Sequence, residues 1–222
     1  MGTTRRAGLA AAALLVGLLG AGCAGDPRPY PPTGVDQLVI PTPSPQPSDF
    51  VATVDNAWFP VVPGTRWVYD GPGGRVARTV VATTGPVVAG VRTSALRTTV
   101  PLSAGQSLTT TDYYAQDRAG NVWWFGRAGQ WRVGGTIGAG LAMPAHPRRG
   151  DGFVMAAAGG FDVRGVTVDT ARRWQGTLGS TRRAVVLEVV RDGVAEVETF
   201  APGLGMVRDG ETGLVAIHQP RS

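Results

Sequence analysis

Beyond Phe50, short runs of Val, Thr and aromatic residues alternate with Gly, Pro, Asp and Asn, and no stretch repeats with helical spacing. Runs of this kind, bounded by turn-forming residues, are typical of β-strands. Residues 65–69 precede the sequence Asp-Gly-Pro-Gly-Gly at 70–74, and the strand pattern resumes over 75–83. Because Gly and Pro favour tight turns, this arrangement predicts a hairpin.

The same pattern continues along the chain. Runs at 91–100, 108–116 and 122–125 are separated by turn residues, and the turn at 117–121 predicts a second hairpin. Residues 184–190 and 194–200 flank Arg-Asp-Gly, in which Asp-Gly is a strong hairpin signal.

Counting such runs predicts an all-β domain of about ten to twelve strands. We expect an antiparallel meander that forms a curved open sheet, a sandwich or a partly open barrel. Only residues 141–147 and 156–160 are expected to be irregular or briefly helical, since Ala, Gly and Pro dominate there.

The N-terminal residues have the pattern of an export signal. Arg5 and Arg6 precede an uncharged, Ala/Leu/Gly-rich stretch over 7–22 that ends at Cys23, the sole cysteine. This stretch is shorter than the ~20 residues that a membrane span needs. We therefore predict a signal peptide at 1–22, either of the lipoprotein type or of the plain secretory type.

The residues around Cys23 favour the lipoprotein type. Leu-Gly-Ala-Gly-Cys at 19–23 resembles the lipobox of bacterial lipoproteins, although Gly20 stands where an aliphatic residue is usual. The resemblance implies that Cys23 is lipidated and becomes the mature N-terminus. Two or more acyl chains give stable anchoring, so we expect an exported protein attached to the bacterial membrane or cell envelope.

A proline-rich segment follows the cysteine. Residues 24–48 contain eight prolines, and Pro occupies every second position from 41 to 47. Proline fixes φ and lacks an N–H donor, so we expect an extended polyproline II spacer. The alternative is a ligand for a proline-binding domain. The predicted organisation is thus a lipidated Cys and tether at 23–48 and a single β domain at 49–222.

Composition and charge exclude several classes of protein. The 33 Gly, 17 Pro and 17% charged residues of the 222-residue chain do not fit a coiled coil or a wholly disordered protein. All 21 basic residues are Arg, and the net charge of +5 falls to +3 without Arg5 and Arg6. The Arg doublets at 148–149, 172–173 and 182–183 fit either anionic head groups or a solvated surface; we expect no nucleic-acid partner.

Four segments of the domain carry a resemblance. They are Phe-Pro-Val-Val-Pro-Gly-Thr-Arg-Trp-Val-Tyr at 59–69, Tyr-Ala-Gln-Asp at 114–117 with Gly-Asn-Val-Trp-Trp-Phe-Gly at 120–126, Met-Pro-Ala at 143–145 with Gly-Asp at 150–151, and Phe-Ala-Pro-Gly-Leu-Gly-Met-Val at 200–207. Together they resemble a family of uncharacterised bacterial exported lipoproteins, in which Tyr is usual in place of Phe200. The resemblance implies export and an open, curved sheet around an apolar interior, without an assigned catalytic residue.

Candidate catalytic and metal-binding residues are few. His146 and His218 are the only histidines, and their spacing does not suggest a zinc site. Asp151 fits a turn as well as a catalytic carboxylate, and Asp117 with Asn121 lacks the further acidic ligands of a calcium loop. We therefore predict no enzyme activity, no metal and no cofactor.

The aromatic residues are the best candidate binding site. We expect Trp67, Tyr69, Tyr114, Trp123, Trp124 and Trp131 to contribute to it. Adjacent residues of a strand point to opposite faces, so one of Trp123 and Trp124 lines something other than the main core. The first hypothesis is a cavity for a lipid or another apolar ligand. The second is an aromatic surface that docks a protein or glycan, and a hydrolase ranks third. The oligomeric state stays open.

Overall fold

The computed structural model describes residues 46–158 and 160–220, and these residues form one antiparallel sheet. Twelve strands follow one another in the order β7-β6-β5-β4-β3-β2-β14-β13-β12-β11-β10-β9, while β1 pairs with β5 and β8 with β6. The predicted all-β meander is confirmed. The strands are β1 (Phe50–Val51), β2 (Arg66–Asp70), β3 (Val76–Val88), β4 (Val91–Pro101), β5 (Ser107–Asp117), β6 (Val122–Arg127), β7 (Trp131–Arg132), β8 (Gly140–Met143), β9 (Gly152–Ala158), β10 (Phe161–Gly176), β11 (Gly179–Arg191), β12 (Val194–Ala201), β13 (Gly205–Asp209) and β14 (Thr212–His218).

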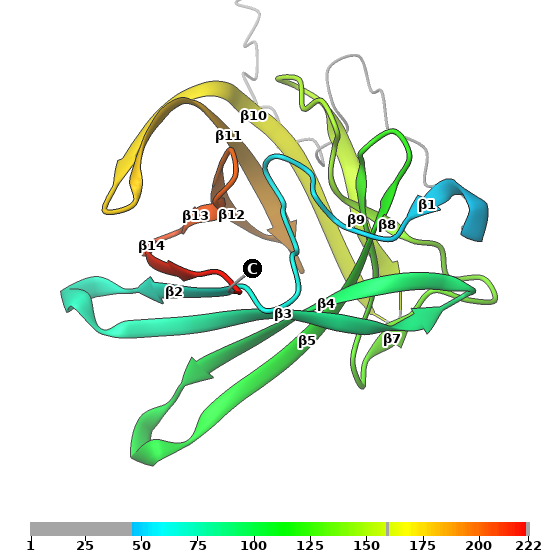
Figure 1. Cartoon of the computed structure of the whole chain (residues 1–222), viewed down its shortest axis with the longest axis horizontal. Helices are drawn as coiled ribbons and strands as arrows, with labels where there is room; N and C mark the ends of the chain where they lie inside the picture. Colours follow the sequence, from blue (N-terminus) through cyan, green and yellow to red (C-terminus); the bar gives the residue numbers. More distant parts are fainter. Residues whose placement is uncertain (1–45, 159, 221–222) are drawn as a thin grey trace, which may run out of the picture. The chain divides into compact units, whose positions relative to one another are not determined.

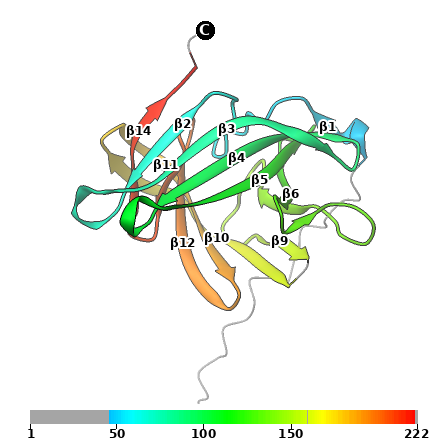
Figure 2. The same ribbon diagram turned by 90° about the horizontal axis from the view of Figure 1, so that it is seen from below.

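The sheet curls into a nearly closed barrel with one unsealed seam (Figure 1). Closure depends on β14 returning to β2, where Leu214 pairs with Tyr69. Figure 2 shows β2–β5 on one side of the barrel and β9, β10 and β12 on the other. At the seam, β8 lies against β9 so closely that a Cβ at Gly140 would overlap the carbonyl oxygen of Met155. A glycine is therefore required where these backbones meet.

The predicted hairpins are confirmed. β2 pairs with β3 across the turn at 71–75, and β5 pairs with β6 across the turn at 118–121. In the β11–β12 hairpin, Arg191 pairs with Val194, and Asp192 and Gly193 have φ values of 50° and 83°. Two consecutive positive φ values are what a type I′ turn needs, which explains why Asp-Gly is a reliable signal.

One prediction about secondary structure is wrong in part. The stretches 141–147 and 156–160, expected to be irregular or briefly helical, contain most of β8 and the end of β9, while residues 144–147 are irregular as expected. Both strands are almost completely buried next to the seam. The small side chains of Ala and Gly have low intrinsic strand preference, but they allow the two strands to pack closely, and tertiary packing overrides propensity.

Alternate turns of a meander lie at the same end of the barrel, so the domain has two distinct ends. The segment 52–65 crosses one of them, which we call the covered end; Figure 1 shows it passing across the ring of strands from β1 to β2. It is held at both sides. The side chain of Gln116 on β5 accepts hydrogen bonds from the backbone of Asp55 and Asn56, and the N–H of Gly203 donates to Ala57.

The two ends are identified by their turns. The covered end carries the turns at 89–90, 118–121, 177–178 and 202–204, and the opposite end carries those at 71–75, 102–106, 128–130, 192–193 and 210–211.

The described chain begins at the covered end. Pro47–Asp49 form a 3-10 turn, so the extended conformation expected of the tether is not adopted there. Arg118 fixes this turn, because its backbone N–H donates to Asp49 and its Nε donates to the carbonyl of Ser48. The rest of the tether and the predicted signal lie outside the described residues. In the part of the chain that the structure describes, no helix is long and apolar enough to cross a membrane.

Candidate functional site

The barrel contains a cavity of about 170 Å³ between its opposite walls. Its lining combines aromatic and aliphatic side chains with six charged ones. They come from residues 52–65, which we call the covering segment, and from nearly every strand of the barrel. The lining residues are Phe59, Pro60, Trp67, Tyr69, Arg78, Val80, Leu96, Thr98, Asp112, Tyr114, Trp124, Arg127, Ala142, Met155, Val163, Arg191, Glu198, Phe200, Gly205, Met206 and Asp209.

Aromatic side chains form one layer of this lining. We define the aromatic layer as Phe59, Trp67, Tyr69, Tyr114, Trp124 and Phe200. Phe59 of the covering segment lies between opposite walls, with its ring centroid 4.9 Å from Tyr114 and 6.2 Å from Phe200. Tyr114 stacks on Trp124 at 6.3 Å, and the indole N–H of Trp67 donates to Leu204 at 2.8 Å. The covering segment is thus part of the site as well as a lid over the covered end.

The period of the strands places these residues on the inner face. Trp67 and Tyr69 are two residues apart on β2, and Glu198 and Phe200 are two apart on β12. Residues i and i+2 of a strand share a face. Tyr114 follows Asp112 on β5 by the same spacing. On both β5 and β12, a charged residue and an aromatic residue therefore share the inner face.

Three ion pairs form a second layer. We define the charged layer as Arg78, Asp112, Arg127, Arg191, Glu198 and Asp209. Arg127 binds Asp112 with two hydrogen bonds, from Nε at 2.7 Å and from an Nη at 3.1 Å. The other two pairs are Arg78–Asp209 and Arg191–Glu198.

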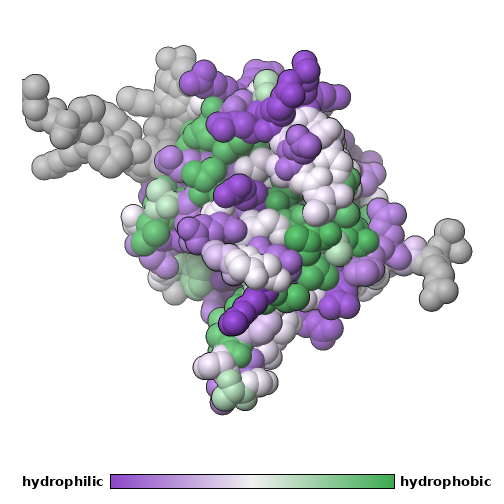
Figure 3. All heavy atoms as spheres, turned by 90° about the vertical axis from the view of Figure 1, so that its left-hand side faces the viewer, coloured by the Kyte–Doolittle hydropathy of each residue, from purple (hydrophilic) through white to green (hydrophobic). Residues whose placement is uncertain are grey.

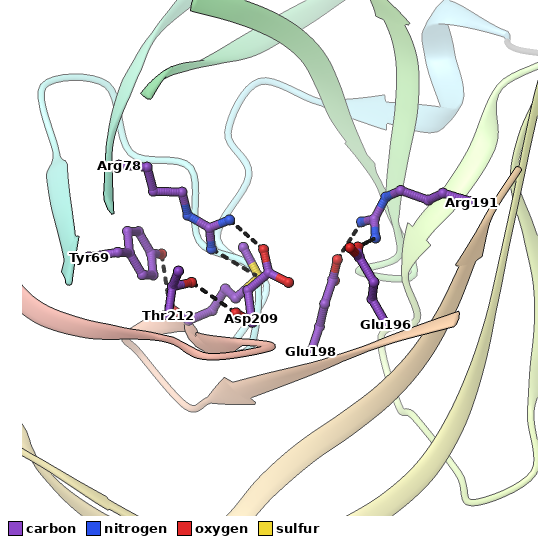
Figure 4. Close-up of polar contacts among 8 residues, drawn as sticks. Tyr69, Arg78, Arg191, Glu196, Glu198, Asp209 and Thr212 are labelled. Carbon is purple, nitrogen blue, oxygen red and sulfur yellow. Dashed lines mark hydrogen bonds and ion pairs between the residues drawn. The ribbon is translucent and has the colours of Figure 1, made fainter. Parts of the chain in front are cut away.

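Two of these ion pairs make further contacts. Figure 4 shows Arg78 and Arg191 reaching their carboxylates from separate strands around the barrel. Arg191 also contacts Glu196 at 2.8 Å, and Arg78 lies over the ring of Tyr69 at 4.4 Å.

The charged layer faces the solvent side of the cavity. The side chains of Arg191 and Arg127 are 38% and 25% exposed, whereas Trp124 and Phe200 are 5% and 1% exposed as residues. Arg127 and Arg191 are the last residues of their strands before turns of the opposite end. The cavity therefore opens toward that end, with charged groups at its entrance and aromatic groups beneath them.

Burial changes the acidity of the carboxyl groups. Desolvation raises the pKa of Glu198, and the attraction of Arg191 opposes this rise. The pKa of Asp112 is raised for the same reason, against hydrogen bonds from Arg127 and Trp124. Burial also raises the pKa of the Tyr114 phenol well above its usual range. Tyr114 is therefore a neutral hydrogen-bonding group at physiological pH.

At least two hydrogen-bonding groups of the site are left without partners among the described residues. The buried Nε of Arg78 has none, and no hydrogen bond involves the hydroxyl of Tyr114. The three arginines and three carboxylates cancel in charge when all are ionised. The arrangement therefore accommodates a ligand that has an apolar part and a polar, hydrogen-bond-accepting part.

The structure divides the six residues predicted from the sequence. Trp67, Tyr69, Tyr114 and Trp124 line the cavity. Trp123 points to the other face of β6, where its indole donates to Asp117 at 2.8 Å. Trp131 is buried behind the site, edge-on to Trp124 at 5.2 Å.

The outer face of β6 is covered by the start of the domain. Phe125, on the same face as Trp123, packs edge-on against Phe50 at 5.1 Å. The two tryptophans therefore do point to opposite faces as the period requires, and Trp123 on the outer face is also buried.

The other polar candidates have structural partners. Both carboxylate oxygens of Asp117 accept hydrogen bonds from Asn121, which closes the β5–β6 turn. The carboxylate of Asp151 accepts the N–H of Arg148 in another turn. His146 and His218 are exposed. Within residues 46–158 and 160–220, no cluster of three His, Cys, Asp or Glu residues could hold a metal ion.

Sequence reasoning missed the charged layer. Its signal is a charged residue at an inward position of an alternating strand, as with Asp112 before Tyr114 and Glu198 before Phe200. An isolated strand does not show which face is inward, and the partners of these residues lie on other strands.

Comparisons with known proteins assign no family. No protein-family model matches the chain, and no curated protein matches it by sequence. Among solved structures, it is similar to a Bacteroides fragilis protein, described as a candidate exported protein with a YmcC-like fold. The identity is 13% and the TM-score 0.41, over 74% of this chain and 100% of that one.

Proposed function

We propose that this protein is a membrane-anchored envelope lipoprotein whose β domain binds a small amphiphilic ligand without transforming it. The observation that supports this proposal is the order of the cavity lining: an aromatic layer inside and a charged layer at the entrance. Binding sites for small molecules combine apolar walls with a few polar groups that fix the ligand's orientation.

The volume of the cavity limits the size of the ligand. An engineered apolar cavity of about 150 Å³ in another protein holds one benzene molecule. A cavity of about 170 Å³ therefore accommodates a single ring or a short acyl segment. A larger lipid would place only one end inside, with the remainder beyond the charged layer.

The polar end of the ligand would lie among the arginines. Arg127 and Arg191 are partly exposed at the entrance, while Arg78 retains an unpartnered Nε–H donor in the buried region. A carboxylate or phosphate on the ligand can accept from such donors, and charge-assisted hydrogen bonds are the strongest ones available. Each carboxylate of the layer is held by an arginine, which favours binding over catalysis.

The alternative function is the docking of a protein or glycan through an aromatic surface. In the described part of the chain, every aromatic residue is buried or half-buried, and the large exposed apolar side chains are Val and Leu. This distribution favours the internal site.

The membrane anchor rests on the residues around Cys23, which lie outside the described residues. The test is to express the full chain and a Cys23→Ser variant and to compare their distribution between membrane and aqueous fractions. We expect the unaltered chain in the membrane fraction and the variant in the aqueous fraction. Equal distribution of the two would contradict lipidation.

Ligand binding is tested with the chain from Ala24 onward, which contains every described element. Native and denaturing mass spectra of the purified protein reveal any small molecule that co-purifies. Trp124→Phe reshapes the cavity, whereas Trp123→Phe makes the same change on the opposite face of β6 and is the matched control. We expect a bound mass that is reduced by Trp124→Phe alone.

Two outcomes would contradict the proposal. One is a native mass of the unaltered protein that contains no bound molecule, both as purified and after incubation with short fatty acids and lysophospholipids. The other is equal ligand loss in both tryptophan variants, which would place the ligand elsewhere. Either would shift support to the docking function.

A further inference from the structure

We propose that the outer part of the β10–β11 hairpin binds anionic lipid head groups and turns the covered end of the barrel toward the membrane. We call residues 171–183 the arginine hairpin. It extends past the core of the barrel and takes no part in the cavity. The proposal is independent of the ligand in the cavity, whereas its choice of a membrane as the partner rests on the lipidation of Cys23 in the proposed function.

The charged residues of this hairpin are all basic. Residues 170–187 contain four arginines and no Asp or Glu. Arg172 pairs with Asp169 at 3.0 Å, just outside this stretch. In the part of the chain that the structure describes, Arg173, Arg182 and Arg183 make no ion pair. Their charge is therefore available to an external partner.

The hairpin is exposed on both faces. All four arginines are exposed, although neighbouring strand residues point to opposite faces. Near its turn the hairpin also carries Leu178, which is 37% exposed, and the half-buried Trp174. Arginine together with Trp or Leu matches a membrane surface, where phosphates lie beside apolar chains.

A second basic segment lies beside the base of the hairpin. The loop with Arg148 and Arg149, both exposed, is tied to β10. The ties are hydrogen bonds from Gly150 to Thr167 at 2.7 Å and from Thr167 to Asp151 at 2.9 Å. Figure 3 shows the left-hand side of Figure 1, toward which the β10–β11 hairpin projects, and hydrophilic residues cover much of this face. The basic surface thus extends beyond the hairpin at the same end of the barrel.

The position of this surface selects a membrane over other anionic partners. The hairpin turn and Gln46, the first described residue, both belong to the covered end. Only residues 24–45 separate Gln46 from Cys23, and 22 residues span at most about 80 Å. If Cys23 is lipidated, the arginine hairpin stays within reach of the bilayer, where each basic side chain near an anionic surface strengthens binding.

This orientation has a consequence for the cavity. The charged layer opens at the opposite end, so the entrance would face away from the membrane. The ligand would then enter from the aqueous side and not directly from the bilayer.

The test is co-sedimentation of the chain from Ala24 onward with two kinds of vesicle, phosphatidylcholine alone and phosphatidylcholine with about one third phosphatidylglycerol. The hairpin variant is R172Q/R173Q/R182Q/R183Q. The matched control is R75Q/R97Q/R132Q/R208Q, which removes four exposed arginines elsewhere and changes the net charge equally. Thermal unfolding of each variant verifies that it is folded.

We expect binding to the anionic vesicles only, weakened by salt because exposed charges are screened. The hairpin variant should bind at least about tenfold more weakly, and the control should bind within about twofold of the unaltered protein. Equal loss in both variants would reduce the effect to net charge and overturn the proposal. Absence of binding to anionic vesicles would also overturn the proposal and would indicate that the surface faces solvent or binds an acidic protein. Equal binding to neutral and anionic vesicles would overturn it as well.

Discussion

The aromatic and charged layers of the cavity are adjacent, yet they are held together by different forces. The aromatic layer is stabilised by burial, which is non-directional and tolerates small changes of shape. Every charge in the charged layer needs an opposite charge from another strand, because an unpaired buried charge is strongly unfavourable. The comparison teaches that the inner layer maintains the barrel, whereas the entrance layer tolerates replacement of both partners of an ion pair together. Under the proposed function, the entrance layer would therefore determine which ligand binds.

The largest effect should come from opening the aromatic layer. Phe200 is 1% exposed, so Phe200→Ala should lower the free energy of unfolding by about 3–5 kcal/mol. Urea denaturation measures this change. Phe50→Ala is the control, since Phe50 is half-buried outside the cavity and should lose less than half as much. Equal losses would show that the aromatic layer has no special part in stability.

Breaking one ion pair should have the next largest effect. Arg127→Met leaves the buried carboxylate of Asp112 without its cation and should cost about 2–3 kcal/mol, less than a fully buried pair because Arg127 is partly exposed. Adding Asp112→Asn removes the stranded charge and keeps an acceptor for Trp124, so the double variant should regain most of the loss in urea denaturation. A double variant no more stable than Arg127→Met would contradict the distinction between the layers.

The pH dependence of stability sharpens the comparison further. Burial raises the pKa of Glu198 in the folded state, so the folded protein holds this proton at a higher pH than the unfolded chain does. Protonation of Glu198 therefore stabilises the folded protein. This stabilisation is fully present below the pKa of the unfolded chain, about 4.3, and is lost as pH rises through the pKa of the folded state. The unaltered protein should therefore gain stability relative to Glu198→Gln as pH falls through this window, by at most about tenfold in the folding equilibrium per pH unit.

Denaturation of both proteins at a series of pH values measures this difference. Phe200→Ala is the control from the aromatic layer, because it removes no titrating group and its difference from the unaltered protein should stay constant with pH. A stability difference between Glu198→Gln and the unaltered protein that moves in the opposite direction would show that Arg191 outweighs burial.

The smallest effects should come from single hydroxyl groups of the aromatic layer. The hydroxyl of Tyr69 donates to Met206 at 2.9 Å, so Tyr69→Phe should destabilise the protein by about 1 kcal/mol. The hydroxyl of Tyr114 has no partner among the described residues, and Tyr114→Phe should change stability by less than about 0.5 kcal/mol. If Tyr114 instead contacts the ligand, its variant should weaken ligand binding in the mass-spectrometric assay while leaving stability unchanged.

Much of the fold could be read from local patterns. The turn at 192–193 is determined by two residues that accept positive φ, and the alternation on β2 places Trp67 and Tyr69 on one face. The strand β8 and the end of β9 could not be read in this way. Their small residues become strand-like only because the seam brings Gly140 against Met155.

The candidate site was predictable in part for the same reason. The period of β6 required Trp123 and Trp124 to lie on opposite faces, but it could not say which of them faces the interior. That choice depends on the curvature of the sheet and on the residues that pack on its outer face, such as Phe50 against Phe125.

The sequence by itself determined the class of fold, most of the strands, the tight turns and the alternation of inward residues, because these depend on the conformational preferences of neighbouring residues. Only the tertiary structure decided that the sheet closes through β14 and β2, and that Arg78 meets Asp209 and Arg191 meets Glu198. The partners of the first pair are 131 positions apart. Such contacts arise from the closure of the whole barrel, and no local pattern encodes them.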